Sequence, residues 1–408
     1  MKKLKLLLLL LIFANLFFFS CTGSQNTSDI SANTPAAFEL VEASIEVEIV
    51  EDIPLITYVN IVAVGDNLVH HPIFEASYSN STYSFHYIFD HIKDYILPAD
   101  IAFINQETIF GNEELGYSGY PRFSTPAEMG TAVVAAGFNV INFANNHALD
   151  RSAAGVMSSI EYLDNYDDVY HLGIHRSQEE RNNRNVIFEM ENISIGFLAY
   201  TFSVNGIAFP AGRNYLVSMI DRDTMRAEVN ALRPLVDYLI VSLHWGEEYA
   251  LSQNRAQRDL AAFLAELQVD LIIGHHPHVL QPMEIITRPD GQPMPVFYSL
   301  GNFLSSHART TKEALLGGIM YVRLAMDSTM ENEITLDEVG LIPVITHFDS
   351  ERRNFGIYPL HEYTDELAAL HWRRLMIGGD PDMTVGFFTE LAGNMFGASL
   401  IMENVFER

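Results

Sequence analysis

The most constraining feature of this chain is an alternation of short apolar runs and helix-like stretches that begins at Val59. The apolar runs read VNIVAVGD, DIAFINQE, NVINFANNH, ISIGFLAYT, DYLIVSLHW, DLIIGHHPH and PVFYSLGNF. Between them the sequence predicts helices at Pro126–Ala136, Ser152–Asn165, Asp223–Leu232 and Ala256–Leu267. Strands that alternate with helices in this way predict a domain of the α/β (α+β) class.

Nearly all of these runs end in side chains that can bind a metal ion or catalyse a reaction. The terminal residues are Asp66, Glu107, Asn145-Asn146-His147, His244, His275-His276-His278 and, as a weaker candidate, Asn302. In open α/β sheets the binding site lies outside the carboxyl ends of the strands. The sequence therefore predicts that segments far apart in the chain deliver Asp, Glu, Asn and His to one site.

The densest of these strand ends is GHHPH. His276 and His278 occupy alternate positions, so an extended backbone would project both imidazoles to the same side. Pro277 disfavours a helical conformation for the residue before it, which supports that expectation. His275 would then point elsewhere and have a supporting or structural role. His70 and His71 follow Asp66 closely and are candidates to line the pocket.

Each motif also has an ordinary structural explanation. A single histidine at a strand end usually bonds to the backbone, and Asn146 could cap the helix near Ser152. Glu107 could be a solvated loop carboxylate, and HWGEEY could be a surface loop with an aromatic anchor. Several such coincidences at equivalent places are less economical than one shared site, so the sequence favours a site.

The amino terminus predicts export and membrane attachment. Lysines precede an apolar run from Leu6 to Phe19, and Ser20 leads to Cys21, the only cysteine. This order is typical of a secretory signal, and the run is shorter than the ~20 residues that span a bilayer. The ending FFSC resembles a bacterial lipobox, in which the cysteine is lipidated. An uncleaved membrane anchor is the alternative.

These features divide the chain into four segments and predict an extracytoplasmic protein that is lipid-anchored to the bacterial membrane. The segments are a lipoprotein signal peptide at 1–21, a flexible tether at 22–55, a folded domain at 56–360 and a C-terminal helical extension at 361–408. The formal net charge is −28, from 52 acidic against 24 basic residues. Phosphate backbones would be repelled, so no nucleic acid is expected as a partner.

The motifs resemble those of the capsule-synthesis CapA family, also called the PgsA-like family of poly-γ-glutamate biosynthesis. The matching segments, in order, are VGDNLVH, INQETIFG, VINFANNHALD, LIVSLHWGEEY, QRDLAAFLAELQVDLIIGHHPHVLQPMEI and VFYSLGNFL. The family usually carries an aromatic residue and glycine where Arg151-Ser152 stand, and its N-L-E motif reads with Gln106 in the middle. The positions of ligand type are intact.

This family in turn looks like the calcineurin-type metallophosphoesterases, which implies a β-sandwich of two mixed sheets flanked by helices. Their GD, GNH, lone-His and GHxH motifs correspond here to Asp66, Asn146-His147, His244, and His276 with His278. Their bridging aspartate has no obvious counterpart, and Glu107 is the natural replacement. The resemblance implies two divalent metal ions, and a donor set of O and N without thiolate suits Mn, Fe or Zn.

In this scheme Glu107 bridges the two cations, because adjacent dications repel each other and need negative charge between them. Asp66, Asn146, His244, His276 and His278 complete the metal ligands. His147 is not needed as a ligand and could protonate a leaving group. Asp150 could orient His147 or cap the following helix.

Two classes of function follow. The first is a metal-dependent hydrolase or transferase acting on a phosphoester or on an amide in an anionic polymer. The second is a non-catalytic, surface-anchored scaffold that binds and exports poly-γ-glutamate or a capsule polymer. Membrane-embedded polymer synthesis proteins are candidate partners in either case.

Overall fold

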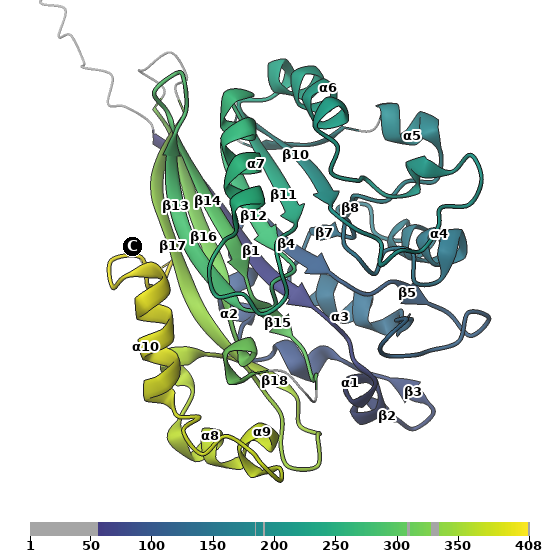
Figure 1. Cartoon of the computed structure of the whole chain (residues 1–408), viewed down its shortest axis with the longest axis vertical. Coiled ribbons are helices and arrows are strands. Elements are labelled where there is room, and N and C mark those ends of the chain that lie inside the picture. Colours follow the sequence, from purple (N-terminus) through teal and green to yellow (C-terminus); the bar gives the residue numbers. More distant parts are fainter. Residues whose placement is uncertain (1–55, 184, 191, 308–310, 328–333, 407–408) are drawn as a thin grey trace, which may run out of the picture. The chain divides into compact units, whose positions relative to one another are not determined.

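A computed structural model describes residues 56–406 except 184, 191, 308–310 and 328–333 (Figure 1). The signal peptide, Cys21 and the tether lie outside the described residues. Two mixed β-sheets form the centre, and helices lie outside them. This arrangement confirms the predicted fold class. Within the described part of the chain, no helix is both long enough and apolar enough to cross a membrane.

The first sheet combines a parallel half with an antiparallel half. β1, β4, β7 and β8 run parallel, whereas β16, β17 and β18 continue from β1 as antiparallel strands. Its spatial order is β18 (Gly356–Pro359), β17 (Ile334–His347), β16 (Leu316–Asp327), β1 (Ile56–Asn67), β4 (Ile101–Gln106), β7 (Val140–Asn142) and β8 (Tyr170–Leu172), with β15 (Asn302–Leu304) paired to β1.

The second sheet has a parallel centre with one antiparallel strand at each edge. Its order is β13 (Leu280–Thr287), β14 (Pro293–Leu300), β12 (Leu271–His275), β11 (Tyr238–His244), β10 (Ile193–Thr201) and β9 (Val186–Met190). Two small ribbons, β2 (Tyr78–Ser79) with β3 (Thr82–Tyr83) and β5 (Phe110–Gly111) with β6 (Thr125–Pro126), lie apart from the sheets.

Alternating side chains of the second sheet enter two different apolar layers, as the two-residue period of a strand requires. Ile240 and Ile273 join the large core that also contains Val62 and Ile104 of the first sheet. Leu239, Val241 and Ile272 face a second cluster. That second cluster is completed by α6 (Arg222–Leu232) and α7 (Arg255–Glu266), and Figure 1 shows α7 covering β11 and β12.

The helices predicted from the sequence are present with ends within about two residues of those expected. They are α3 (Glu128–Ala135), α4 (Ser152–Leu163), α6 and α7. The shorter helices are α1 (His71–Ala76), α2 (Lys93–Ile96) and α5 (Gln178–Asn183). After residue 360 the chain forms α8 (Asp365–Leu370), α9 (Trp372–Leu375) and α10 (Val385–Phe396), and Phe388 and Phe396 of α10 join the large core.

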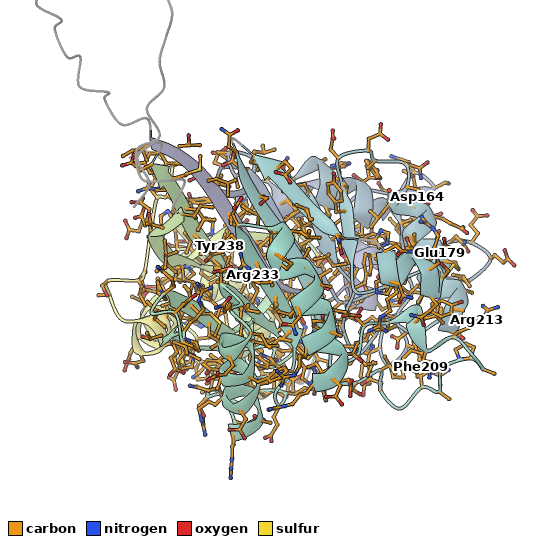
Figure 2. The ribbon with its side chains drawn as sticks, turned by 90° about the horizontal axis from the view of Figure 1, so that it is seen from above. Asp164, Glu179, Phe209, Arg213, Arg233 and Tyr238 are labelled. Atoms are coloured by element: carbon orange, nitrogen blue, oxygen red, sulfur yellow. The ribbon has the colours of Figure 1, made fainter. Side chains whose placement is uncertain are left out.

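The amino ends of β11 and β12 are tied together by one buried carboxylate, Asp270. It forms ion pairs with Arg233 and Arg288 and accepts a 2.7 Å hydrogen bond from the backbone N–H of Leu239. Figure 2 shows Arg233 and Tyr238 close together at this end. Because these strands are parallel, their opposite, carboxyl ends also come together, and the predicted site residues lie there.

Candidate metal centre

Asp66 reaches the site through a close approach of two backbones. The pairing of β1 with β4 shifts register between Val64 and Asp66. A Cβ atom at Gly65 would lie 1.9 Å from the carbonyl oxygen of Gly301, so only glycine fits between the strands. Asp66 follows with no exposed surface, and its Oδ1 accepts a 2.7 Å hydrogen bond from Asn105 Nδ2.

Glu107 comes directly after β4 and is completely buried. Neither oxygen of its carboxylate has a hydrogen-bond partner. The alternative of a solvated loop carboxylate is therefore wrong. A buried carboxylate without a donor is costly for a fold, and such groups are normally paired or bound to a metal ion.

The NNH motif after β7 is held by its first asparagine. Asn145 donates a 2.9 Å hydrogen bond to the carbonyl of Gln106 and accepts a 3.1 Å bond from the backbone N–H of His147. Asn146 Oδ1 lies 2.9 Å from His244 Nε2, the side chain that ends β11. Asn146 thus faces the site, and the helix-cap alternative for it is wrong.

Asp150 orients His147. Its Oδ2 lies 2.8 Å from His147 Nδ1 and also accepts a 2.6 Å hydrogen bond from the backbone N–H of Phe123. The helix that follows, α4, begins after Arg151, and no side chain caps it. Of the two roles that the sequence left open for Asp150, the geometry therefore matches the orienting one.

The HHPH segment reaches the site in a different way from that expected. β12 ends at His275, which pairs with His244, and the next residues turn instead of remaining extended. His276 has φ of 96° and His278 has φ of 58°, both in the left-handed region that few residues other than glycine adopt. The prediction of an extended segment is therefore wrong. The turn directs both rings back toward Asp66 and Glu107.

His275 itself lies beside Asp66, with 3.6 Å between Nδ1 and Oδ1, and its ring stacks on Phe103. This placement matches a supporting position. Asn302, the weaker candidate, donates a 3.1 Å hydrogen bond to the carbonyl of His278 and so holds the turn.

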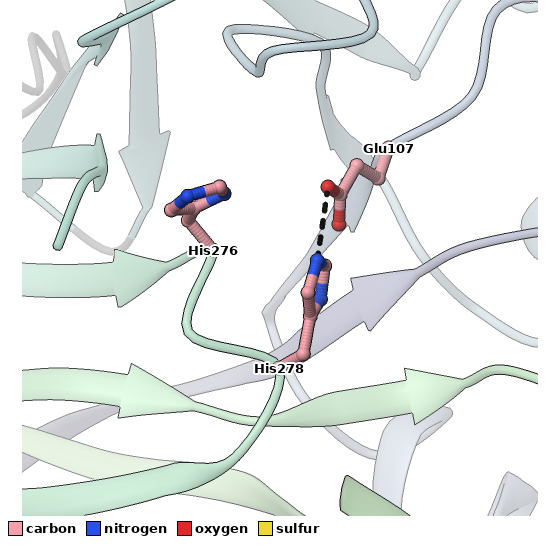
Figure 3. Close-up of side chains that lie close together, drawn as sticks. All are labelled: Glu107, His276 and His278. Carbon is pink, nitrogen blue, oxygen red and sulfur yellow. Dashed lines mark ion pairs between the residues drawn. The ribbon is translucent and has the colours of Figure 1, made fainter. Parts of the chain in front are cut away.

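Three residues form a compact cluster of ligand type. Each residue offers one ligand atom, and these atoms of Glu107, His276 and His278 all lie within 4.8 Å of one another. All three residues are buried (Figure 3). Figure 3 shows His276 and His278 on the loop after β12, with the dashed 3.7 Å contact from His278 Nε2 to Glu107.

The other predicted ligands surround this cluster. His278 Nδ1 lies 3.0 Å from Asp66 Oδ2. His244 Nε2 lies 3.6 Å from Glu107 Oε1, and the His244 ring lies 4.8 Å from that of His276. The structure thus brings together all the residues predicted to bind metal. Their role as ligands stays a prediction.

Burial and charge give the cluster distinct protonation preferences. Burial raises the pKa of Glu107 well above its ordinary value, and Asp66 adds to that effect. Burial also lowers the pKa of His276 to about 3, so its imidazole is neutral at pH 7. For His278, burial lowers the pKa, but the Glu107 and Asp66 carboxylates outweigh it and raise the value to about 9. A cation here would take the place of the His278 proton.

The donor set fits a hard or borderline divalent cation. It offers carboxylate oxygen, amide oxygen and imidazole nitrogen, and no thiolate. Asn105, which the sequence analysis did not select, belongs to the support of this set, because it hydrogen-bonds Asp66 and in turn accepts a 2.9 Å bond from Asn142. Its position at the end of β4, one strand away from Asp66, was the available signal.

A cavity of about 600 Å³ adjoins the cluster. His147 and His278 line it, and so do His70 and His71, the two histidines that follow β1. A substrate in this cavity would lie against the candidate proton donor and one of the candidate ligands.

The sequence model of a protein family, described as bacterial capsule synthesis protein PGA_cap, matches residues 60–307. The chain belongs to this family. Two curated relatives are similar to this chain over shorter lengths. The PGA biosynthesis protein CapA of Bacillus subtilis is 32% identical over 44% of this chain and 46% of the relative. The capsule biosynthesis protein CapA of Bacillus anthracis is 28% identical over 57% of each chain. The chain thus spans about half the length of these relatives.

Among solved structures, the NAD nucleotidase NadN of Haemophilus influenzae gives a TM-score of 0.44 at 13% identity, covering 72% of this chain and 58% of that one. The 5'-nucleotidase precursor of Thermus thermophilus gives a TM-score of 0.44 at 14% identity, covering 71% of this chain and 54% of that one.

Proposed function

We propose that this PGA_cap protein is a metal-dependent hydrolase or transferase that acts on a phosphoester or on an amide bond in an anionic polymer. The observation that carries the proposal is the buried cluster of Glu107, His276 and His278, whose ligand atoms lie within 4.8 Å of one another. Glu107 brings to it a carboxylate with no hydrogen-bond partner on either oxygen. A fold rarely keeps such a group unless it binds something.

Divalent cations would be held by Asp66, Glu107, Asn146, His244, His276 and His278. When bound, they would polarise the scissile bond and offset the negative charge that develops on the substrate. The side chains provide the rest. Asn105 hydrogen-bonds the Asp66 carboxylate and His275 lies beside it, and the Asn302 amide holds the turn that carries His276 and His278.

His147 is placed to move a proton. Its Nδ1 faces Asp150 at 2.8 Å, which leaves Nε2 as the nitrogen that can exchange a proton with a group in the cavity. The ring of Phe123 meets the imidazole edge-on at a centroid distance of 4.7 Å and limits its rotation. A histidine held by a carboxylate in this way is suited to general acid–base catalysis.

The amino-terminal sequence supports a proposal for where the protein acts. We propose that Cys21 carries the lipid that anchors the protein to the outer side of the bacterial membrane. A polymer chain made or exported by membrane-embedded synthesis proteins would then pass within reach of the domain. The basic start, apolar run and single cysteine support this location.

The deciding experiment measures metal and turnover in the same preparation. Full-length protein, purified in detergent without chelator, should contain about two equivalents of transition metal by mass spectrometry. It should also hydrolyse a generic phosphoester or a γ-linked glutamate polymer. His147→Ala should keep the metal and lower turnover by 10²- to 10⁴-fold, the usual contribution of an acid–base group.

His86→Ala is the matched control, because His86 is exposed and lies outside the site. It should change neither quantity. A folded wild-type protein with a negligible fraction of an equivalent of metal would refute the enzyme and leave the non-catalytic scaffold.

A further inference from the structure

The cavity beside the cluster has a second wall that the proposed chemistry does not use. On this wall lie Arg352, from the turn between β17 and β18, and Ser306, which follows β15. His147 and His278 also line this cavity. A molecule that fills the cavity would therefore touch the reactive residues with one part and Arg352 with another.

Arg352 is a partly buried cation without an anionic partner. Among the described residues, no carboxylate oxygen lies within ion-pair distance of its guanidinium. Its Nη2 donates hydrogen bonds to the carbonyl oxygen and the hydroxyl of Ser306, both neutral acceptors. Its guanidinium lies 5.0 Å above the Trp372 ring, and its Nε is buried with no partner. These contacts fix the group in place without a direct ion pair, and Glu75 interacts with its charge only at longer range.

The charge of the lining differs from that of the protein as a whole. The chain has a net charge of −28, yet among the described residues that line this cavity Glu248 is the only carboxylate. His70, on the same wall, is 5% exposed, and its ring Nε2 has no hydrogen-bond partner. Burial lowers the pKa of His70 to about 3, so it is a neutral polar group. The described lining therefore offers the positive charge of Arg352, the negative charge of Glu248 and an unpaired imidazole nitrogen at His70.

We propose that Arg352 binds an acidic group of the substrate, a carboxylate or a phosphate, and positions the adjoining bond beside His147. This inference rests on the proposed function, because it assigns the substrate of that same site. A guanidinium forms two parallel hydrogen bonds with either group, which fixes its orientation as well as its position. Arg352 is thus a positioning residue, and a neutral substrate of the same size would lose this contact.

The test compares two neighbouring arginines. Arg352→Gln and Arg353→Gln remove the same charge from the same turn, but Arg353 is exposed and does not line the cavity. Binding to the metal-loaded full chain in detergent is measured by calorimetry, with a short γ-linked glutamate oligomer as one probe and inorganic phosphate as the other. Arg352→Gln should weaken binding of at least one probe by about 10-fold or more, and Arg353→Gln by less than about 2-fold.

The two probes identify the acidic group. A loss confined to the glutamate oligomer indicates a carboxylate, and a loss confined to phosphate indicates a phosphate. Arg352→Lys keeps the charge without the planar fork, and it should lie between wild type and Arg352→Gln. It also provides the measurement if Arg352→Gln does not fold. Equal binding by wild type and Arg352→Gln, or an equal loss in Arg353→Gln, would overturn the inference.

Failure of this inference and failure of the proposed function look different. Normal metal content and turnover, combined with no effect of Arg352, would remove only the positioning role. A protein without metal or turnover that still binds a probe through Arg352 would remove only the enzyme, and Arg352 would then be a polymer-binding residue of a scaffold.

Discussion

Replacing Glu107 with glutamine should change the stability of this protein in opposite directions with and without metal. The carboxylate is completely buried, neither oxygen has a hydrogen-bond partner, and its contacts to His244 and His278 are 3.6 and 3.7 Å long. Without a cation, the carboxylate faces the His278 imidazolium, which lies 3.7 Å away and pairs more closely with Asp66, so its desolvation is only partly compensated. Glutamine has nearly the same shape and no charge to desolvate.

The expected magnitudes follow from these contacts. In the metal-free protein, Glu107→Gln should raise the free energy of unfolding by about 1–3 kcal/mol, the usual cost of leaving a buried polar or charged group unpaired. Metal at about 100 times its dissociation constant should stabilise the wild type by about 2.7 kcal/mol. The variant lacks the carboxylate charge and should lose most of that gain. The order of stability should therefore reverse when metal is added.

Denaturant unfolding, followed in EDTA and in excess Mn²⁺ or Zn²⁺, measures both differences on the same proteins. Glu248→Gln is the control, since Glu248 is exposed, lies on the nearby cavity and should change stability by no more than about 0.5 kcal/mol. If Glu107→Gln is less stable than wild type in EDTA, or gains the same stabilisation from metal, the carboxylate has a structural partner and the reasoning is wrong.

Three further predictions concern other parts of the chain. Cys21→Ser should move the protein from the membrane to the soluble fraction. If the Cys21→Ser variant stays in the membrane fraction after a carbonate wash, lipid anchoring at Cys21 is excluded. Gly65→Ala should destabilise the fold strongly and lower metal content, because its Cβ would meet the Gly301 carbonyl at 1.9 Å, whereas Gly393→Ala, with open space around it, should be tolerated. Burial lowers the pKa of His371 to about 3, so wild-type stability should be complete above pH 6.5 and fall below it by up to about 1.4 kcal/mol per pH unit. His371→Asn should fall less steeply in urea titrations between pH 6.5 and 4, and equal slopes would contradict this.

The strands that carry the site were predictable because two sequence features mark each of them. An apolar run such as Leu271–Ile273 predicts the strand, and a polar residue of ligand type marks its carboxyl end. Parallel pairing then brings neighbouring ends together, as it does for Asp66 beside Asn105 and for His244 beside His275. Neither step requires knowledge of side-chain packing.

The strands in the antiparallel half of the first sheet lack this combination of an apolar run and a ligand-type cluster at its end. β16 pairs with the other edge of β1, β17 pairs with β16, and no strands were expected there from the sequence. Their residues, such as those of GLIPVITH, alternate weakly and end in no ligand-type cluster that would distinguish strand from loop. Their place is decided by the open edge of β1, which is a property of the assembled sheet.

The turn at His276 and His278 was not predictable, and it says most about the site. A proline between two histidines favours an extended backbone, yet both histidines adopt positive φ values of 96° and 58°. Conformations of this kind cost on the order of 1–3 kcal/mol each and persist only where the surroundings enforce them. Asn302 holds the turn by donating a hydrogen bond to the carbonyl of His278. In this strained conformation both imidazoles face the buried, unpaired carboxylate of Glu107. Local rules are broken here by the backbones of His276 and His278 and by the unpaired Glu107 carboxylate, and a cation bound between these residues would offset the three costs together.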